Sequence, residues 1–202
     1  MLDKDFSYLN IEIFDGKNFT PFKLPEGKID KDFAISTTKM IHKIFEDSKG
    51  KLWFCTNAGL YSYANQKLDN ESQKLGIKTS FVNGVYESKQ GVFWISTKEG
   101  LYSLKEQSVD NITKDKIIIG KGIGSVSEDK DGKLWLVSNQ HDLYIYDNIK
   151  LTEIKKDESN KRTVIFQIFK DQLNRLWFVG FGGVYRFEKD KFINITKNGP
   201  WN

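Results

Sequence analysis

The chain repeats one short phrase four times. Trp53, Trp94, Trp135 and Trp177 recur at intervals of 41, 41 and 42 residues. A polar turn with Gly or Asn precedes each Trp, and a Leu-Tyr or Val-Tyr pair follows it. A period of about 40–45 residues built from short strands is typical of the blades of a β-propeller. The repeat therefore predicts an all-β propeller fold.

Each unit is predicted to contain four strands, because apolar and polar residues alternate between clusters of Gly, Asp and Asn. Between the first two strands, Asp47-Ser48-Lys49-Gly50 predicts a hairpin turn in which Gly50 adopts positive φ and Asp47 bonds back to the turn. Asn174 replaces this Gly in the fourth unit and tolerates the same conformation. For the first complete unit, the predicted strands are 40–46, 52–56, 60–63 and an outer strand around 67–75.

The ends of the chain indicate an incomplete fifth blade. Residues 10–20 match the second half of a unit, as in 143–151, and so predict its two outer strands. The chain stops at 198–202, where the next first strand would begin. We expect one propeller domain over residues 1–202, with four full blades and one partial blade. The expected blades are approximately 6–28 (partial), 38–75, 79–114, 120–156 and 162–197.

Aligned columns separate packing positions from variable ones. The Trp column recurs at one strand position in every unit, which favours packing between neighbouring blades over a ligand platform. Cys55 aligns with small or apolar residues and is expected to be a buried filler. The first strand is expected to pack through two apolar columns. These are Ile41, Val82, Ile123 and Ile165, and then Ile44, Val85, Val126 and Ile168.

Composition narrows the class of partner. The net charge of +4 comes from Lys mixed with Asp and Glu, with Arg only at Arg162, Arg175 and Arg186. Nucleic-acid binders concentrate Arg for phosphate and base contacts, so we expect no nucleic-acid partner. No apolar run is long enough for a spanning helix and the first residues do not form a signal peptide, so we expect no membrane insertion. One cysteine excludes an internal disulfide.

Catalysis is not expected. The segment from Asp47 to Trp53 is close to the Asp-box of sialidase propellers, but its Asp lies three residues before the Gly instead of two. Sialidase-like chemistry would also need an arginine cluster, whereas Arg175 and Arg186 occupy a turn and an ordinary repeat position. The chain has two His and no pair of Cys, so it offers few side chains that could coordinate a metal ion. We therefore expect no metal and no cofactor.

Binding residues are expected where the repeat is broken at a loop, because the shared columns are used for packing. The loop at 139–142 in the third unit is one residue longer than its equivalents and lacks their Gly. In the first strand, His42 aligns with Asn83, Gly124 and Phe166. Amides, an imidazole and charged groups suit a hydroxyl-rich ligand. The candidate ligand-binding residues are Asn139, Gln140, His141, Lys98, Glu99, Asn57, His42, Asn83 and Gln167.

The phrase of acidic residue, turn Gly, Leu-Trp-apolar-x-Thr and Gly-Leu-Tyr resembles the two-component regulator propeller repeat of bacterial hybrid two-component sensors. The resemblance implies a non-catalytic sensor module in signal transduction that binds a polar small molecule or oligosaccharide. It also implies a periplasmic or extracellular location, with the cytoplasm as the alternative. A protein-interaction scaffold and a carbohydrate-active enzyme are alternative functions. A protein partner or a second copy is expected at the incomplete blade, around residues 10–14.

Overall fold

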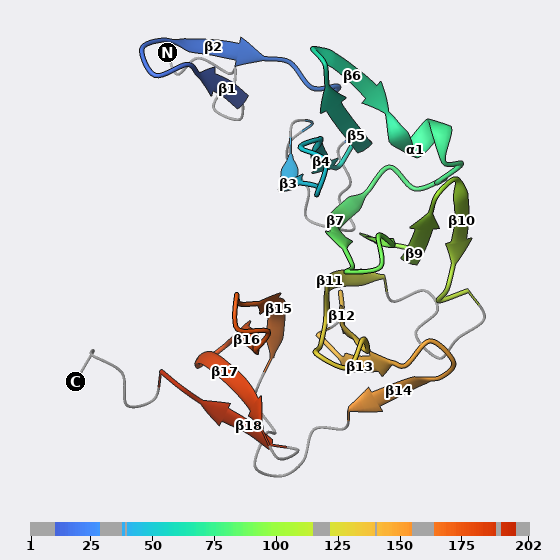
Figure 1. The fold of residues 1–202 in the computed structure, drawn as a ribbon, viewed down its shortest axis with the longest axis vertical. Helices are drawn as coiled ribbons and strands as arrows, with labels where there is room; N and C mark the ends of the chain where they lie inside the picture. Colours follow the sequence, from blue (N-terminus) through green and yellow to red (C-terminus); the bar gives the residue numbers. More distant parts are fainter. Residues whose placement is uncertain are drawn as a thin grey trace. The chain divides into compact units, whose positions relative to one another are not determined.

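The computed structural model describes residues 11–28, 38, 40–114, 122–139, 141–154, 164–188 and 191–196. The chain divides into two compact units, Met1–Val82 and Asn83–Asn202. The strands within the described residues form four four-stranded antiparallel sheets and one two-stranded hairpin. In each sheet the neighbouring strands are consecutive in the chain (Figure 1). We call the four-stranded sheets blades 1 to 4 in chain order. The predicted number of blades, with a partial fifth, is confirmed.

The first unit contains the hairpin and blade 1. The hairpin consists of β1 (Ile11–Phe14) and β2 (Phe19–Phe22). Blade 1 consists of β3 (Ile41–Glu46), β4 (Leu52–Thr56), β5 (Gly59–Ala64) and β6 (Lys67–Asn70). Phe22 joins the two, because its ring lies 5.3 Å from Phe54 and 5.0 Å from Tyr63 between centroids.

The other three blades follow. Blade 2 consists of β7 (Val82–Glu87), β8 (Phe93–Thr97), β9 (Gly100–Lys105) and β10 (Ser108–Asn111). Blade 3 consists of β11 (Ile123–Glu128), β12 (Leu134–Ser138), β13 (Leu143–Tyr146) and β14 (Leu151–Ile154). Blade 4 consists of β15 (Ile165–Lys170), β16 (Leu176–Gly180), β17 (Gly183–Glu188) and β18 (Lys191–Asn194).

One aspartate organises the turn before each Trp-bearing strand in three of the blades. Asp47 Oδ1 accepts hydrogen bonds from the amides of Lys49 and Lys51, both at 2.9 Å, and Oδ2 accepts from Trp53 Nε1 at 2.9 Å. Asp129 and Asp171 bond in the same way within blades 3 and 4. The predicted turn is confirmed, and the carboxylate also fixes the indole.

Burial of the Asp47 carboxyl works toward a higher pKa. The hydrogen bonds from Trp53 and from the turn amides outweigh it and hold the pKa below its ordinary value of 3.8. The carboxylate therefore stays charged in the folded state. The fourth turn residue has positive φ in every blade, as predicted, at 77° for Gly50, 73° for Gly91, 79° for Gly132 and 60° for Asn174.

Two Trp rings of the second unit pack against the next blade. Trp94 shares an apolar cluster with Val126 and Tyr144 of blade 3. The ring of Trp135 lies 5.3 Å from Phe178 and 4.8 Å from Phe187, both in blade 4. The predicted packing between blades is thus confirmed for these two residues. Trp177 is only half-buried, and the guanidinium of Arg175 lies 5.3 Å from its ring centroid.

The apolar columns of the first strand are buried in blades 2 to 4, whereas Ile41 of blade 1 is only half-buried. Val85, Val126 and Ile168 are at most 8% exposed, whereas Ile44 of blade 1 is 50% exposed. In the second unit, this column packs against the Trp strand of the preceding blade, as in the cluster of Ile168 with Trp135. The two-stranded hairpin before blade 1 has no such strand. The expectation that Ile44 is a packing residue is therefore wrong, because no strand among the described residues covers it.

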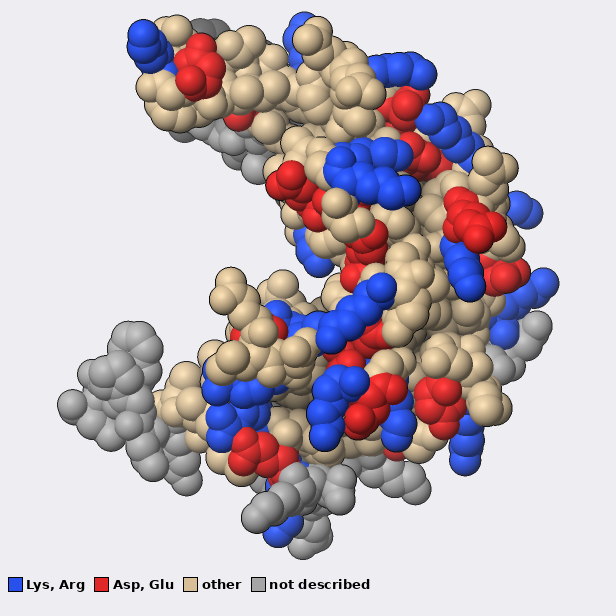
Figure 2. All heavy atoms as spheres, in the orientation of Figure 1, with Lys and Arg blue, Asp and Glu red and all other residues tan. Residues whose placement is uncertain are grey.

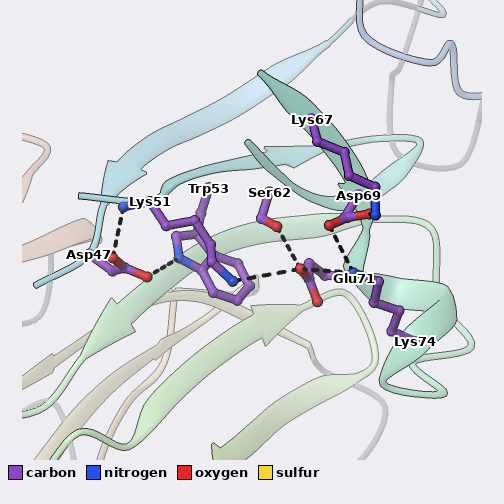
Figure 3. A network of polar contacts seen from close by, with 8 residues as sticks. All are labelled: Asp47, Lys51, Trp53, Ser62, Lys67, Asp69, Glu71 and Lys74. Carbon is purple, nitrogen blue, oxygen red and sulfur yellow. Dashed lines mark hydrogen bonds and ion pairs between the residues drawn. The ribbon is translucent and has the colours of Figure 1, made fainter. Parts of the chain in front are cut away.

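Blade 1 also ends differently from the prediction. The outer strand stops at Asn70 instead of continuing toward residue 75, and the short helix α1 (Glu71–Lys74) follows. Asn70 Oδ1 accepts from the amide of Gln73 at 2.9 Å and caps this helix. Glu71 is buried and accepts from Ser62 Oγ at 2.5 Å (Figure 3). Figure 3 also shows Lys74 between Glu71 and Asp69, with Nζ 3.7 Å and 3.0 Å from their carboxylates.

The Gly of each Gly-Leu-Tyr or Gly-Val-Tyr phrase is required by a neighbouring hydroxyl. Gly100 has φ 149°, and a Cβ there would overlap Thr113 Oγ1. That hydroxyl accepts from the amide of Leu101 at 3.0 Å. Ser72 in blade 1 and Thr196 in blade 4 have the same role. The contact fixes the start of the third strand against the segment that follows the fourth.

We predict that Trp94→Ala lowers the free energy of unfolding by about 3–5 kcal/mol, because it leaves a cavity between blades 2 and 3. Urea unfolding followed by circular dichroism measures this loss. Trp94→Phe is the milder control. A loss below about 1 kcal/mol, with an unchanged spectrum, would contradict the packing role.

The turn of blade 2 predicts a stabilising substitution. Ser88 occupies the position of Asp47 and is equally buried, at 7% exposed. Its Oγ accepts from the amide of Val92 at 3.1 Å, while Trp94 Nε1 is buried and has no hydrogen-bond partner within the described ranges. We expect Ser88→Asp to supply the missing acceptor and raise the free energy of unfolding by about 1 kcal/mol.

Urea unfolding also measures this gain. Ser88→Asn is the matched control, since its amide nitrogen offers the indole a donor at the place where aspartate offers an oxygen. If the two variants have the same free energy of unfolding, the missing acceptor for Trp94 Nε1 does not lower the stability of the protein.

Candidate functional site

The candidate residues gather at one end of each blade because the first two strands are antiparallel. The first residue of the inner strand pairs with the last residue of the second strand, as in Ile123 with Ser138 and Ile165 with Gly180. The second residue of the inner strand therefore lies beside the loop that follows the second strand. This end of the blade is opposite the Asp-bearing turn.

A β-bulge places one side chain outside the strand ladder at this end. The pairing register skips His42 in blade 1, Gly124 in blade 3 and Phe166 in blade 4. A bulge leaves one residue unpaired and re-aims its side chain, and such bulges are over-represented next to functional sites. The variable column of the inner strand is thus a column of bulge residues in these blades.

The sequence contains a signal for this bulge that the sequence analysis missed. The two apolar columns of the inner strand lie three residues apart, as in Ile165 and Ile168. An odd spacing would put them on opposite faces of a regular strand. Both are nevertheless buried, at 3% and 4% exposed, because the bulge adds one residue between them.

Two candidate amides meet in the second unit. Asn83 Nδ2 donates to the backbone oxygen of Ile123 at 2.6 Å and to Asn139 Oδ1 at 3.3 Å. Gly122 and Gly124 leave room for the Asn139 side chain, since a Cβ on Gly122 would overlap it. The contact joins the inner strand of blade 2 to the long loop of blade 3.

An aromatic cluster lies across blades 3 and 4. The ring of His141 is 5.2 Å from that of Phe166, which is 4.7 Å from that of Phe181, and both pairs are edge-on. Phe166 is 39% exposed and Phe181 is 65% exposed. His141 has φ 65°, so the longer loop turns through a left-handed residue at this point. The loop insertion thereby brings an imidazole to two exposed rings.

The remaining described candidates of the second unit lie on β15 and in the loop between β8 and β9. Gln167 is exposed next to Phe166 on β15. Lys98 and Glu99 form the loop between β8 and β9, where Lys98 is half-buried and Glu99 is exposed. The Glu99 amide donates to Thr97 Oγ1 at 3.1 Å. Gln140 lies outside the described residues.

The two candidates of the first unit are less accessible. Asn57 is 3% exposed, and its Oδ1 accepts from the amide of Met40 at 3.2 Å, so this side chain holds the start of the inner strand. His42 lies 4.4 Å from Phe81 between ring centroids. Its Nε2 is buried and has no hydrogen-bond partner in the described part of the chain.

A polar cluster links three inner strands of the second unit at their C-terminal ends, away from the bulges. Lys170 Nζ donates to Tyr86 Oη at 2.9 Å, and Tyr86 Oη donates to Glu128 Oε2 at 3.3 Å. Burial, together with the Glu128 charge, raises the pKa of Tyr86, and burial lowers that of Lys170. Tyr86 therefore remains a neutral phenol, and its hydrogen bonds join blades 2, 3 and 4.

The described residues show no arrangement typical of metal or sialidase-like chemistry. No group of three or more His, Cys, Asp or Glu within the described ranges could hold a metal ion. Arg175 is exposed, and its Nε donates to Asp171 Oδ2 at 2.6 Å in the turn. On the face drawn in Figure 2, blue Lys and Arg side chains are interspersed with red Asp and Glu.

Comparison with known proteins identifies the repeat. Residues 36–58 match the family model described as a two component regulator propeller. The match covers 23 of the 202 residues and lies in the first complete unit. The resemblance of its phrase to this repeat is thereby confirmed, and the matched segment contains β3, the Asp47 turn and β4. No curated protein matches the chain. No helix among the described residues could span a membrane.

Solved structures with the same fold include extracellular domains and a lyase. The extracellular domain of a putative one-component system from B. thetaiotaomicron has a TM-score of 0.64 and 21% identity, covering 84% of this chain and 23% of that chain. The extracellular domain of a putative hybrid two-component system from the same organism has a TM-score of 0.64 and 20% identity, covering 84% and 25%. Virginiamycin B lyase from Staphylococcus aureus has a TM-score of 0.65 and 18% identity, covering 92% and 63%.

These comparisons confirm the predicted β-propeller fold. The propeller of this chain spans about a quarter of the length of the two extracellular domains. Because the identities are low, the likeness concerns the fold of the blades and not their ligands.

The environment of His42 predicts a pH dependence. Burial lowers the pKa of His42 below its ordinary value of 6.5. The unfolded chain therefore binds a proton as the pH falls through 6.5 while the folded chain does not, so this residue makes the free energy of unfolding decrease at acidic pH.

We expect His42→Phe to gain stability over the wild type when the pH is lowered from about 8 to about 5.5. Phenylalanine is already present at the equivalent position, Phe166. Urea unfolding at both pH values measures the difference, and His141 remains in both proteins as an internal control. An unchanged difference between the two proteins would contradict the lowered pKa.

Proposed function

We propose that this chain is a non-catalytic, sensor-type propeller module for signal transduction and that it binds a polar small molecule or an oligosaccharide. The proposed site is the bulge end of blades 2 to 4, formed by Asn83, Asn139, His141, Phe166 and Phe181. We also propose a periplasmic or extracellular location, in line with the extracellular domains that share the fold.

The observation that carries the proposal is the pair of exposed rings beside the imidazole. Phe166 and Phe181 lie in contact at the surface, although burial of both would be favourable in a folded chain. Sugar rings present C–H faces that pack on aromatic faces, and hydroxyls that pair with amides and imidazoles. His141 and Asn139 supply such groups from one loop.

A lyase shares the fold, so an enzymatic role needs a separate argument. The His141 ring faces the ring of Phe166, and a general base is normally oriented by a carboxylate or hydroxyl. This contact favours binding over acid–base chemistry. A protein-interaction scaffold would use the same exposed rings, and it is separated from the sensor by the kind of ligand that binds.

The test is a thermal-shift screen of glycans and polar small molecules. A ligand at 100 times its dissociation constant stabilises the folded state by about 2.7 kcal/mol. We expect Phe181→Ala to weaken binding of any hit by at least about tenfold. Leu173→Ala is the matched control, because Leu173 is also exposed, at 70%, but lies in the Asp171 turn at the other end of blade 4.

His141→Ala should change the free energy of unfolding by no more than about 0.5 kcal/mol while it weakens ligand binding. Binding that is unaffected by both His141→Ala and Phe181→Ala would exclude this site. Turnover of a bound glycan would show an enzyme, and the absence of any shift across the screen would favour the scaffold.

A further inference from the structure

The hairpin β1–β2 has the geometry of the outer half of a blade. Its register pairs Ile11 with Phe22 and Phe14 with Phe19, as β13–β14 pairs Leu143 with Ile154 and Tyr146 with Leu151. The turns also agree. Asp15 Oδ1 accepts from the amides of the second and third residues after it, and Asp147 Oδ1 does the same. The hairpin is therefore a third and a fourth strand.

The two edges of this hairpin differ. The Asp15 amide donates to Asn18 O, so the alternation of an antiparallel pair turns the amides of Glu12 and Phe14 away from β2. On the other edge, Pro21 occupies a position whose amide would point outward, and proline lacks that donor. The outer edge is thus blocked, while the inner edge keeps its donors. In blade 3 the equivalent inner edge is paired with β12.

The hairpin also exposes side chains that a complete blade buries. Phe14 and Phe19 are 56% and 66% exposed, with ring centroids 4.6 Å apart. In blade 3, Leu151, at the position of Phe19, is 8% exposed, and Tyr146, at the position of Phe14, is half-buried. The hairpin thus carries apolar residues at positions that are less exposed in a complete blade, where the two inner strands are present.

Blade 1 indicates independently what covers this edge. Ile44 is 50% exposed, whereas Val126 and Ile168 are buried beneath the Trp strand of the preceding blade. In both of those blades the strand over this position carries a Trp, and no described strand covers Ile44. A strand that covers Ile44 in the same way would carry a Trp and pair with β1.

We propose that the inner edge of β1 is a docking site for an inner-strand β-hairpin of the same repeat, whose Trp-bearing second strand pairs with β1 and covers Ile44. Every inner hairpin within the described ranges is already paired with its own outer strands. The occupant is accordingly a further copy of the inner-hairpin sequence, comparable to β11–β12.

Two experiments test the docking site. In the first, a fluorescein-labelled peptide with the sequence of residues 122–138 is titrated with the full chain, and fluorescence anisotropy measures binding. In the second, a second copy of residues 122–142 replaces residues 1–10, so that the inner hairpin precedes β1 as it precedes β13. Hydrogen exchange of the Phe14 amide then reports pairing of the edge.

We expect saturable peptide binding, and exchange of the Phe14 amide at least about tenfold slower in the chimera than in the wild type. Glu12→Pro removes one donor from the inner edge and should weaken peptide binding by about tenfold or more. Glu12→Tyr is the matched control. It keeps the amide and restores the residue found at Tyr61 and Tyr144, so binding should persist.

Three results would overturn the proposal. Peptide binding that Glu12→Pro leaves unchanged would place the peptide elsewhere. Unchanged exchange at Phe14 in the chimera would show that the edge does not accept an inner hairpin even when tethered to it. A wild-type dimer in sedimentation that Glu12→Pro dissociates would assign the edge to a second copy of this chain.

Discussion

In blades 1, 3 and 4, the carboxylate in the turn before the Trp-bearing strand determines three features of the structure. One aspartate accepts from two amides of the turn and from the indole of the following strand. The same carboxylate therefore sets the turn, the position of the second strand and the orientation of a large ring. In blade 3 that ring contacts the next blade, so a local turn and the packing between blades share one acceptor. Hydrogen bonds to a charged acceptor are stronger than neutral ones, so the carboxylate holds both the turn amides and the indole more strongly than a neutral acceptor would.

The repeat made the number of blades and the chemistry of the turn predictable, because both depend on residues close together in the chain. The exposure of Ile44 was not predictable from its column, since it depends on a strand of another blade. The helix α1 was missed for a different reason. A four-residue helix has almost no periodicity, and its stability comes from the Asn70 cap and from the contact between Glu71 and Ser62.

The candidate site was predictable at the level of position and less so at the level of partners. Breaks in the repeat indicated the bulge end of the blades, where we propose the site, but alignment could not show that Asn57 is buried in the packing or that Phe166 and Phe181 form an exposed pair. Those outcomes depend on the bulge, which is visible in the sequence only as the three-residue spacing of apolar columns. Side-chain orientation at a bulge is set by backbone geometry and not by residue type.

The bulge has a consequence for how such a module can change over time. A residue outside the ladder contributes little to strand pairing, so histidine, glycine and phenylalanine occupy the same position in different blades while the ladder on either side is kept. The proposed site can therefore be altered one blade at a time without a new fold. Substitutions at separate bulges should combine independently, whereas Asn83 and Asn139, which share a hydrogen bond, form a coupled pair that must change together.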